Sequence, residues 1–212
     1  MMVGRDGAGG GVEVRRATAA DVEPMAAQLC RAFFDDPIMG FVFRNERRRN
    51  QGMFRYFTSQ MRGDYLSFGA CYTTDDHKGA AIWGPPGKPL LTGLAGIANL
   101  VAVFPYVATH LKATLQLIST MESLHPHEPH WYLATLGTDP DVQGKGIGSA
   151  LMRVVLDQCD AEVVPAYLES SKERNVPFYR RHGFEVVKEF PVPGGGPKIW
   201  TMWREPRPLE TT

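Results

Sequence analysis

Three glycines stand within five residues, at positions 144, 146 and 148, directly before a stretch with the apolar spacing of a helix. Glycine in a helix interior destabilises the helix by about 0.5–1 kcal/mol relative to alanine, so three glycines at a helix start need a physical reason. The glycines form the pattern Q-x-x-G-x-G, beginning at Gln143, and follow the apolar segment Trp131–Leu136, which is predicted to be a strand. The pattern is not a P-loop, because glycine rather than serine or threonine follows Lys145.

A strand that turns through glycines into a helix predicts a pyrophosphate site. The first N–H groups of a helix have no partner within the helix and carry partial positive charge. Glycine removes the Cβ that would keep a phosphate from the backbone, and Lys145 adds a cation at the same place. The alternative is a glycine-rich helix start kept only for close packing, which accounts less well for the complete strand–turn–helix context.

The composition narrows the class of protein. The 212 residues suit one domain, and 23 basic against 23 acidic residues give no electrostatic attraction to nucleic acid or an anionic membrane. The isolated cysteines Cys30, Cys71 and Cys159 have no C-x-x-C spacing, which indicates a reducing, cytoplasmic location. Residues 1–11 lack the apolar centre of a signal peptide and are expected to form a flexible leader.

Periodicity predicts a mixture of helices and strands with at least one parallel crossover. The predicted strands lie at 12–18, 65–74, 79–83, 131–136, 164–170, 184–190 and 198–203, and the helices at 18–33, 44–61, 89–124 (in two parts), 147–159 and 175–183. In the second helix, Arg44, Arg47, Arg48 and Arg49 are interpreted as a solvated face. The segment H-P-H-E-P-H at 125–130 is interpreted as a loop entering a strand rather than a metal site.

Two signatures resemble those of one superfamily. "VQGKGIG" is similar to the acetyl-CoA pyrophosphate loop of the GNAT superfamily of N-acetyltransferases, and "ERNVPFYRRHGF", about thirty residues further on, resembles its second signature. More narrowly, "EPHWYLATLGTDPDVQGKGIGSAL", "VPAYLESSKERNVPFYRRHGF" and "GPKIWTMWREP" resemble the puromycin-acetylating, antibiotic-resistance branch of that superfamily. A weaker similarity, which includes "GAAIWGPP" and "AFFDDP", extends over most of the chain.

The resemblance implies an α/β (α+β) GNAT fold, with a central mixed, splayed sheet of about seven strands flanked by helices. It implies a single domain at 12–206 with a helical insertion at about 88–126 and a tail at 207–212. The implied activity is direct transfer of the acetyl group of acetyl-CoA to a primary amine of a small molecule, puromycin or a related compound. No metal, nucleic acid or membrane is expected, and the protein would be a monomer or homodimer. The alternatives are a non-catalytic acyl-CoA sensor and an enzyme for protein or peptide amines.

The resemblance also implies roles for named residues. Those expected to bind acetyl-CoA are Leu136, Gly137, Thr138, Gln143, Gly144, Lys145, Gly146, Ile147, Gly148, Ser149, Asn175 and Phe178. Tyr179 is the expected catalytic residue, because a phenol beside the thioester sulfur can protonate the leaving thiolate. Asn175 would contact the cofactor arm or cap a helix, or both. For the base that takes the amine proton we expect Glu169, with Glu128, His130 and a water chain as alternatives.

The segment from Pro89 to Leu111 contains no Asp, Glu, Lys or Arg and approaches the about 20 residues that span a bilayer. Because Pro105 would kink a helix there, buried or pocket-lining helices are favoured over a membrane span. We expect the helical excursion to 124 to form the acceptor-side wall, with a dimer contact or a cover for the sheet as alternatives. The apolar side chains available for that wall are Leu94, Ile97, Val101, Phe104 and Tyr106.

Overall fold

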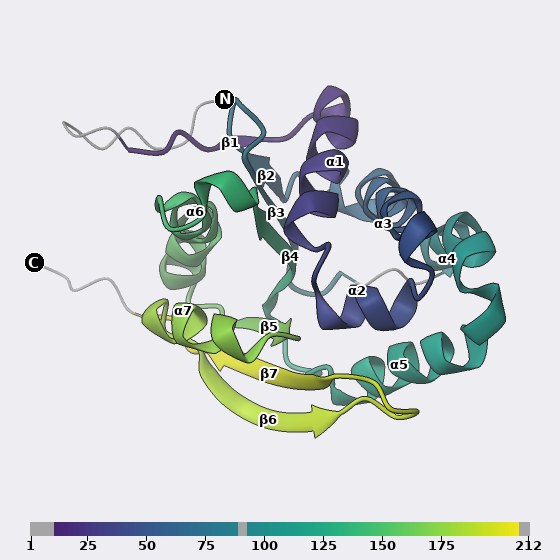
Figure 1. The fold of residues 1–212 in the computed structure, drawn as a ribbon. Coiled ribbons are helices and arrows are strands. Elements are labelled where there is room, and N and C mark those ends of the chain that lie inside the picture. The colour runs from purple at the N-terminus through teal and green to yellow at the C-terminus, as the bar shows by residue number, and fades with distance from the viewer. Residues whose placement is uncertain (1–10, 89–92, 208–212) are drawn as a thin grey trace, which may run out of the picture.

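A seven-stranded sheet with strand order β1-β2-β3-β4-β5-β7-β6 organises the computed structural model, which describes residues 11–88 and 93–207 (Figure 1). Its strands are β1 (Arg15–Arg16), β2 (Cys71–Thr73), β3 (Gly79–Gly84), β4 (Trp131–Thr138), β5 (Ala166–Ser170), β6 (Glu185–Pro191) and β7 (Lys198–Arg204). Only β4 and β5 pair in parallel; the other neighbours are antiparallel. The mixed sheet and its parallel crossover are therefore confirmed.

Helices cover both faces of the sheet (Figure 1). The helices are α1 (Val22–Ala32), α2 (Pro37–Val42), α3 (Glu46–Gln60), α4 (Gly93–Val107), α5 (Leu111–Leu124), α6 (Ile147–Glu162) and α7 (Val176–Arg181). One buried cluster joins α6 and α7 to the sheet, and a second joins α1 and α3 to its other face. A third and smaller cluster packs Leu117 of α5 against Phe190, Val192 and Ile199 of the β6–β7 hairpin.

Three elements differ from the sequence-based expectation. The first strand is two residues long rather than spanning 12–18. None of the segment 65–70 is a strand, because a π-helical turn, Met61–Tyr65, continues α3 and a turn at 66–69 follows it. Helix α2 was not expected at all. It begins at Pro37, and the carboxylate of Asp36 accepts hydrogen bonds from the backbone N–H groups of Ile38 and Met39, so "DDP" ends one helix and starts another.

The parallel pair β4–β5 opens part-way along its length. Three residues of β4 pair with β5, and the last pair is Leu133 with Leu168. From Ala134 to Thr138, β4 continues without β5. All of β5 pairs with β7, but Glu169 and Ser170 pair with β7 alone. A bulge lies at the same point, because Trp83 of β3 pairs with Leu133 but Ile82 pairs with Thr135, which leaves Ala134 as the extra residue. The sheet is therefore splayed, as expected.

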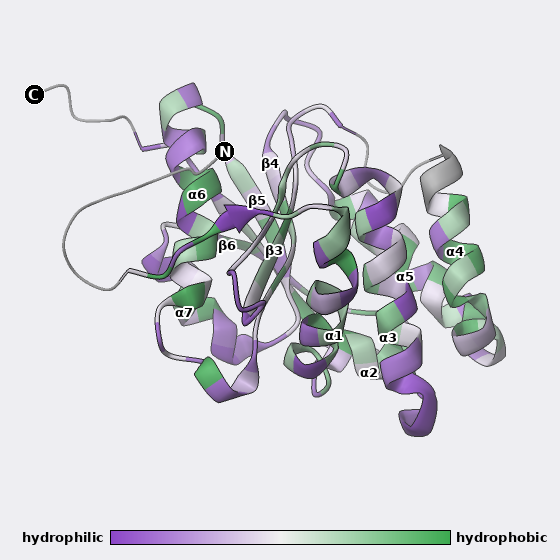
Figure 2. Cartoon of the chain, turned by 90° about the horizontal axis from the view of Figure 1, so that it is seen from above, coloured by the Kyte–Doolittle hydropathy of each residue, from purple (hydrophilic) through white to green (hydrophobic). Residues whose placement is uncertain are grey.

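The segment between β3 and β4 forms two helices at the edge of the molecule (Figures 1 and 2). By length and composition alone, the helical run Gly96–Leu124 within the described chain could cross a membrane. It is not one straight helix, because a 3-10 turn, Ala108–His110, separates α4 from α5. Most of the leader at 1–11 and the tail at 207–212 lies outside the described residues.

Candidate active site

The glycine loop between β4 and α6 has an open surface. Gly144 and Gly146 adopt left-handed backbone conformations, with φ of +79° and +83°, that L side chains rarely take. A Cβ added to either residue would meet nothing within 4 Å, so neighbouring atoms do not fill the space above them. The side chain of Gln143 closes the loop by donating a hydrogen bond from Nε2 to the carbonyl of Thr138, at 3.3 Å.

The N-terminus of α6 points its free N–H groups into this loop. The first helical hydrogen bond runs from Ala150 N–H to the Gly146 carbonyl, so the N–H groups of residues 146–149 have no partner inside the helix. At position 148, close packing rather than backbone conformation requires glycine. A Cβ there would lie 3.3 Å from the ring of Phe178 in α7. Both interpretations of the glycines hold, at different positions: an open backbone at 144 and 146, and close packing at 148.

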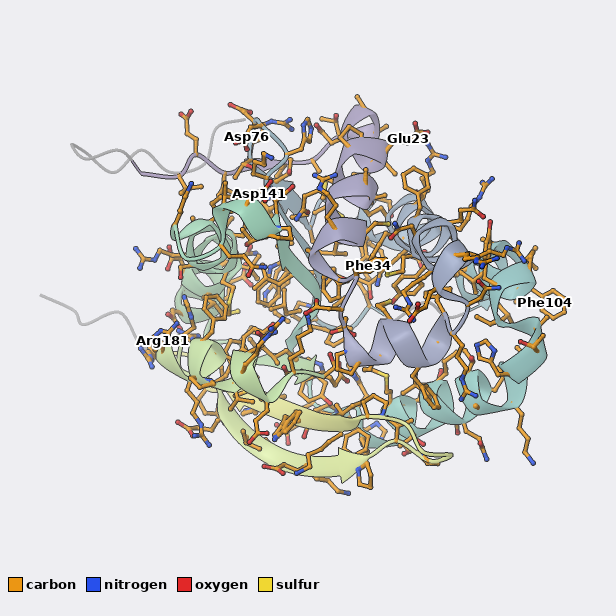
Figure 3. The ribbon with its side chains drawn as sticks, viewed as in Figure 1. Glu23, Phe34, Asp76, Phe104, Asp141 and Arg181 are labelled. Atoms are coloured by element: carbon orange, nitrogen blue, oxygen red, sulfur yellow. The ribbon has the colours of Figure 1, made fainter. Side chains whose placement is uncertain are left out.

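Ion pairs anchor the start of the loop. The buried carboxylate of Asp139 lies 2.6 Å from the guanidinium of Arg31 in α1 and 3.7 Å from Lys78 in the β2–β3 turn. Its other oxygen accepts from the backbone N–H of Asp141, which Figure 3 labels at the turn into α6. Gly137, just before, packs so closely on α1 that an added Cβ would lie 2.7 Å from Leu29. The loop is thereby fixed to elements on both sides.

Glu169 is the first residue of β5 beyond the last β4–β5 pair, and its side chain is only 5% exposed. Tyrosines surround it. Burial raises the pKa of Tyr132 and Tyr167, and the negative charge of Glu169 raises both further. Burial and then the charge of Glu169 raise the pKa of Tyr56 in α3 to about 12. These phenols stay protonated near neutral pH, so Glu169 is the group in this cluster that can carry negative charge.

A polar network continues from this cluster along the same face of β4. Thr135 Oγ1 donates to the side-chain oxygen of Gln60, at 3.3 Å, and Gln60 Nε2 lies 3.5 Å from the Tyr56 hydroxyl. Gln60 and Thr135 are both buried. The bulge at Ala134 turns Thr135 onto this face, beside the opening between β4 and β5.

Tyr179 lies on the opposite face of the sheet from Glu169. It is buried in the same cluster as Leu133 and Leu168, and successive residues of a strand point to opposite faces. Burial, and then the charge of Asp36, raises the pKa of Tyr179, so its phenol also stays protonated. Asp36 in turn accepts a 2.5 Å hydrogen bond from Ser171 Oγ.

A second set of contacts joins the α1–α2 loop to the loop after β5. Asp35 lies 2.6 Å from Lys172 Nζ and 2.8 Å from the guanidinium of Arg174. Together with the Asp36–Ser171 hydrogen bond, these contacts hold the two loops together at the open end of the splayed strands.

Comparisons with known proteins agree with this architecture. Residues 106–186 match the acetyltransferase (GNAT) domain family. The chain is 28% identical over 192 residues to an uncharacterized N-acetyltransferase of Schizosaccharomyces pombe, a match that covers 80% of this chain and 73% of that protein. A Corynebacterium glutamicum structure described as histone acetyltransferase HPA2 and related acetyltransferase superposes with a TM-score of 0.69 at 25% identity, covering 94% of this chain and 98% of that one.

The chain has the GNAT fold and carries an acetyltransferase (GNAT) domain. A Drosophila melanogaster polyamine N-acetyltransferase that forms N-acetylagmatine shares the fold of this acetyltransferase, with a TM-score of 0.61 at 13% identity, over 92% of this chain and 100% of that one. An Aedes aegypti arylalkylamine N-acetyltransferase does so with a TM-score of 0.62 at 11% identity, over 92% and 99%. GNAT enzymes use acetyl-CoA as acyl donor, and these neighbours are named for amine acceptors.

The acetyltransferase brings most of the expected cofactor residues together. The loop 143–149, the end of β4 and Phe178 of α7 form one continuous region around the N-terminus of α6. Asn175 occupies the position before α7, but its side chain makes no capping hydrogen bond, so the capping role is wrong. Of the alternative bases, Glu128 is exposed, whereas His130 is buried next to His125 rather than at the opening.

The expected acceptor-side wall in α4 is not formed as predicted. Ile97, Val101 and Phe104 are 60%, 68% and 47% exposed, and Figure 3 shows Phe104 pointing away from the molecule. Tyr106 packs under the guanidinium of Arg48, 4.7 Å from its ring centroid. The Leu94 side chain lies outside the described part of the chain. Tyr56 of α3, which lies near Glu169, and Gln60, which contacts Tyr56, were missed, although the two stand four residues apart on one helix face.

Proposed function

We propose that this acetyltransferase moves the acetyl group of acetyl-CoA directly to a primary amine of a small molecule, with Glu169 as base and Tyr179 as acid. The observation that carries this proposal is the buried carboxylate of Glu169 at the point where β4 and β5 part, enclosed by neutral tyrosines. A group in that position can attract an ammonium ion and remove its proton.

The residues around the α6 N-terminus would hold acetyl-CoA, which supplies an acyl group activated as a thioester. The left-handed, open glycines 144 and 146 and the free N–H groups of residues 146–149 fit a pyrophosphate. The unpaired edge of β4 at Leu136, Gly137 and Thr138 fits the amide groups of a pantetheine arm. Lys145 is exposed beside the loop, and Asn175 is free to contact the arm.

Glu169 would act on the amine. An amine attacks only after it has lost a proton, and a carboxylate within reach can accept that proton. Because Tyr132 and Tyr167 remain neutral, the negative charge that orients the ammonium belongs to Glu169. The near-complete burial of its side chain strengthens this attraction, since water does not screen it.

Tyr179 would act on the sulfur. Formation of the amide bond releases a thiolate, which needs a proton or a hydrogen bond as it leaves. The raised pKa of Tyr179 keeps its proton on the phenol until a stronger base appears beside it. Glu169 and Tyr179 lie on opposite faces of the sheet near the end of the Leu133–Leu168 pair, so a thioester held at this opening would be within reach of both faces.

For the acceptor we propose puromycin or a related amino-bearing compound, in the cytoplasm. Support comes from the three sequence segments that resemble the puromycin-acetylating branch and from fold neighbours named for small amines. Tyr56, Gln60 and Thr135 would form the polar side of the acceptor pocket next to Glu169.

The test is a panel of amines in an acetyl-CoA-dependent thiol-release assay, with puromycin, agmatine, tryptamine and a lysine-containing peptide as acceptors. We expect CoA release with puromycin and an N-acetylated product by mass spectrometry. Release with the peptide alone would favour a protein acetyltransferase. Tight acetyl-CoA binding without release by any amine would favour a non-catalytic sensor.

A further inference from the structure

Two histidines stand directly behind Glu169, in the loop that leads into β4. His125 Nδ1 lies 3.8 Å from Glu169 Oε1, and His125 Nε2 lies 3.1 Å from His130 Nε2. The other nitrogen of His130, Nδ1, lies 2.6 Å from the backbone carbonyl of Glu128. The two imidazole rings therefore form a chain that starts at the carboxylate and ends at a carbonyl oxygen.

The carbonyl at the end of this chain determines where the protons are. A carbonyl oxygen only accepts, so His130 Nδ1 carries a proton and donates it to Glu128. Burial lowers the pKa of His130, so the ring is neutral and its Nε2 is an acceptor. The hydrogen bond between the rings then requires a proton on His125 Nε2. In neutral His125 this leaves an unprotonated Nδ1, and that atom faces Glu169.

We propose that His125 receives the proton that Glu169 takes from the amine, and that His130 is a positioning residue that holds His125 in the tautomer able to do so. This proposal rests on the proposed role of Glu169 as base. In the step, the O–H bond of protonated Glu169 breaks and an N–H bond forms at His125 Nδ1, which leaves a carboxylate and an imidazolium. The atoms are about 1 Å further apart than in a hydrogen bond, so the carboxyl group must turn towards the ring.

The difference in exposure between Glu169 and His125 sets the direction in which the proton would move. The Glu169 side chain is 5% exposed and that of His125 is 22% exposed, so a proton on His125 can pass to water while one on Glu169 is enclosed. The relay would return Glu169 to its charged form without opening the acceptor pocket. His130 is itself buried, so it suits the role of a positioning residue better than that of a group that releases the proton to water.

The neighbours of the pair are aromatic rings and two carboxylates. The titratable groups that face the two histidines are Tyr132 of β4, Tyr167 and Glu169 of β5, and Glu128 of the preceding loop. Trp203 of β7 packs its indole ring, which does not titrate, against His130. Burial keeps both tyrosines protonated. Because the tyrosines keep their protons, the imidazole nitrogens are the proton acceptors that this cluster offers to Glu169.

The tautomers can be tested without any substrate, by long-range ¹H–¹⁵N NMR of protein labelled with ¹⁵N-histidine. Signals would be assigned with the variants His125→Gln, His130→Gln and His127→Gln. Neutral His130 is expected in the Nδ1–H form and neutral His125 in the Nε2–H form. His130 in the Nε2–H form, or His125 in the Nδ1–H form, would overturn the proposal.

Kinetics with puromycin and acetyl-CoA then test the relay itself. His125→Gln keeps a donor for His130 but cannot take up a proton, so kcat should fall by about 10²-fold, the lower end for positioned acid–base groups, with the KM for acetyl-CoA unchanged. His130→Gln, whose amide oxygen can still accept from His125, should keep most activity, whereas His130→Leu should lose it. The exposed His127→Gln is the matched control and should behave as wild type.

The pH profile separates a relay from a structural role. If the relay operates, kcat of the wild type should decrease at acid pH, because a doubly protonated imidazole accepts no further proton, and His125→Gln should lose that dependence. A His125→Gln enzyme with wild-type kcat and pH profile, beside an inactive Glu169→Gln enzyme, would overturn the relay and leave the proposed function intact. A fully active Glu169→Gln enzyme would overturn the base assignment and the relay together.

Discussion

Leu133 of β4 and Leu168 of β5 form the last pair of the only parallel ladder in the sheet as described, and Glu169 is the next residue of β5. One extra residue in β4, Ala134, lies at the same level. The opening between the strands and the buried carboxylate beside it therefore arise from a single change in strand pairing. The glycine loop lies at the far end of the open strand, so both halves of the site belong to one β-strand–helix–β-strand unit, β4–α6–β5.

Gly146→Val should abolish binding of acetyl-CoA. The residue has φ of +83°, and a branched side chain would strain the backbone and occupy the open space above the loop. Calorimetric titration with acetyl-CoA measures the effect. Gly195→Val is the matched control, because Gly195 has φ of +78° and equally open surroundings in the β6–β7 turn. Unchanged affinity in a folded Gly146→Val protein would disprove the pyrophosphate site.

Tyr179→Phe should lower kcat by about 10²–10⁴-fold, the usual effect of removing a general acid, and leave the KM for acetyl-CoA nearly unchanged. The ring and its packing against Phe184 remain in the variant. Tyr72→Phe provides the control, since Tyr72 is a buried tyrosine of the same cluster on β2. Equal small effects of the two substitutions on kcat would make Tyr179 a packing residue only.

The part of the site that sequence predicts well is local in the chain. The turn from β4 into α6 depends on glycines, a capping position and apolar periodicity within about twenty residues, and it was found where expected. The parallel pairing of β4 with β5 followed from the strand–helix–strand order. These features are determined by neighbours in sequence.

The part that sequence did not predict depends on contacts between distant segments. Arg49, expected on a solvated face, donates to the Phe43 carbonyl and is 14% exposed, because α2 folds back against α3. In α4, Val103 and Val107 are buried whereas Ile97, Val101 and Phe104 are exposed, and no periodicity in one helix reveals which of its apolar side chains a neighbour covers. Tyr56 lies near Glu169 although more than 100 residues of chain separate them, which a single sequence does not indicate.

Tyr56→Phe should raise the KM for the amine by about 2- to 10-fold, the effect of one lost hydrogen bond, with less effect on the KM for acetyl-CoA. The tyrosine hydroxyl lies next to Gln60 on the acceptor side of Glu169. Phe104→Ser should change neither KM, because Phe104 points into solvent. Steady-state kinetics with both substrates varied would distinguish the two variants, and a selective rise in amine KM for Phe104→Ser would restore α4 as the acceptor wall.

Asp21→Asn should destabilise the fold by about 1–2 kcal/mol at neutral pH, allowing for partial exposure of its partner. Asp21 is buried, accepts a 2.7 Å hydrogen bond from Arg15 and contacts His77. It therefore links β1 to the β2–β3 turn. Hydrogen bonds from Arg15 above all lower its pKa in the folded protein. The stabilisation is therefore present above the unfolded pKa near 3.9 and is lost as the pH falls through the folded value.

Urea denaturation at neutral and acid pH checks that prediction. The difference in unfolding free energy between wild type and Asp21→Asn should shrink as the pH falls below about 4. Asp75→Asn serves as the control, since Asp75 contacts the same guanidinium but is 72% exposed, and it should change stability by less than about 1 kcal/mol. A difference for Asp21→Asn that grows on acidification would contradict the assignment.

The central claim is that an amine loses its proton to Glu169 at the opening between β4 and β5. Its most direct test is the initial rate of CoA release from acetyl-CoA with saturating puromycin, measured for wild type, Glu169→Gln and the exposed control Glu173→Gln. We predict N-acetylpuromycin in amounts equal to the released CoA for wild type and Glu173→Gln, and a rate about 10²–10⁴-fold lower for Glu169→Gln. Equal rates for all three proteins, or acetyl-CoA binding without amine-dependent release by wild type, would contradict the claim.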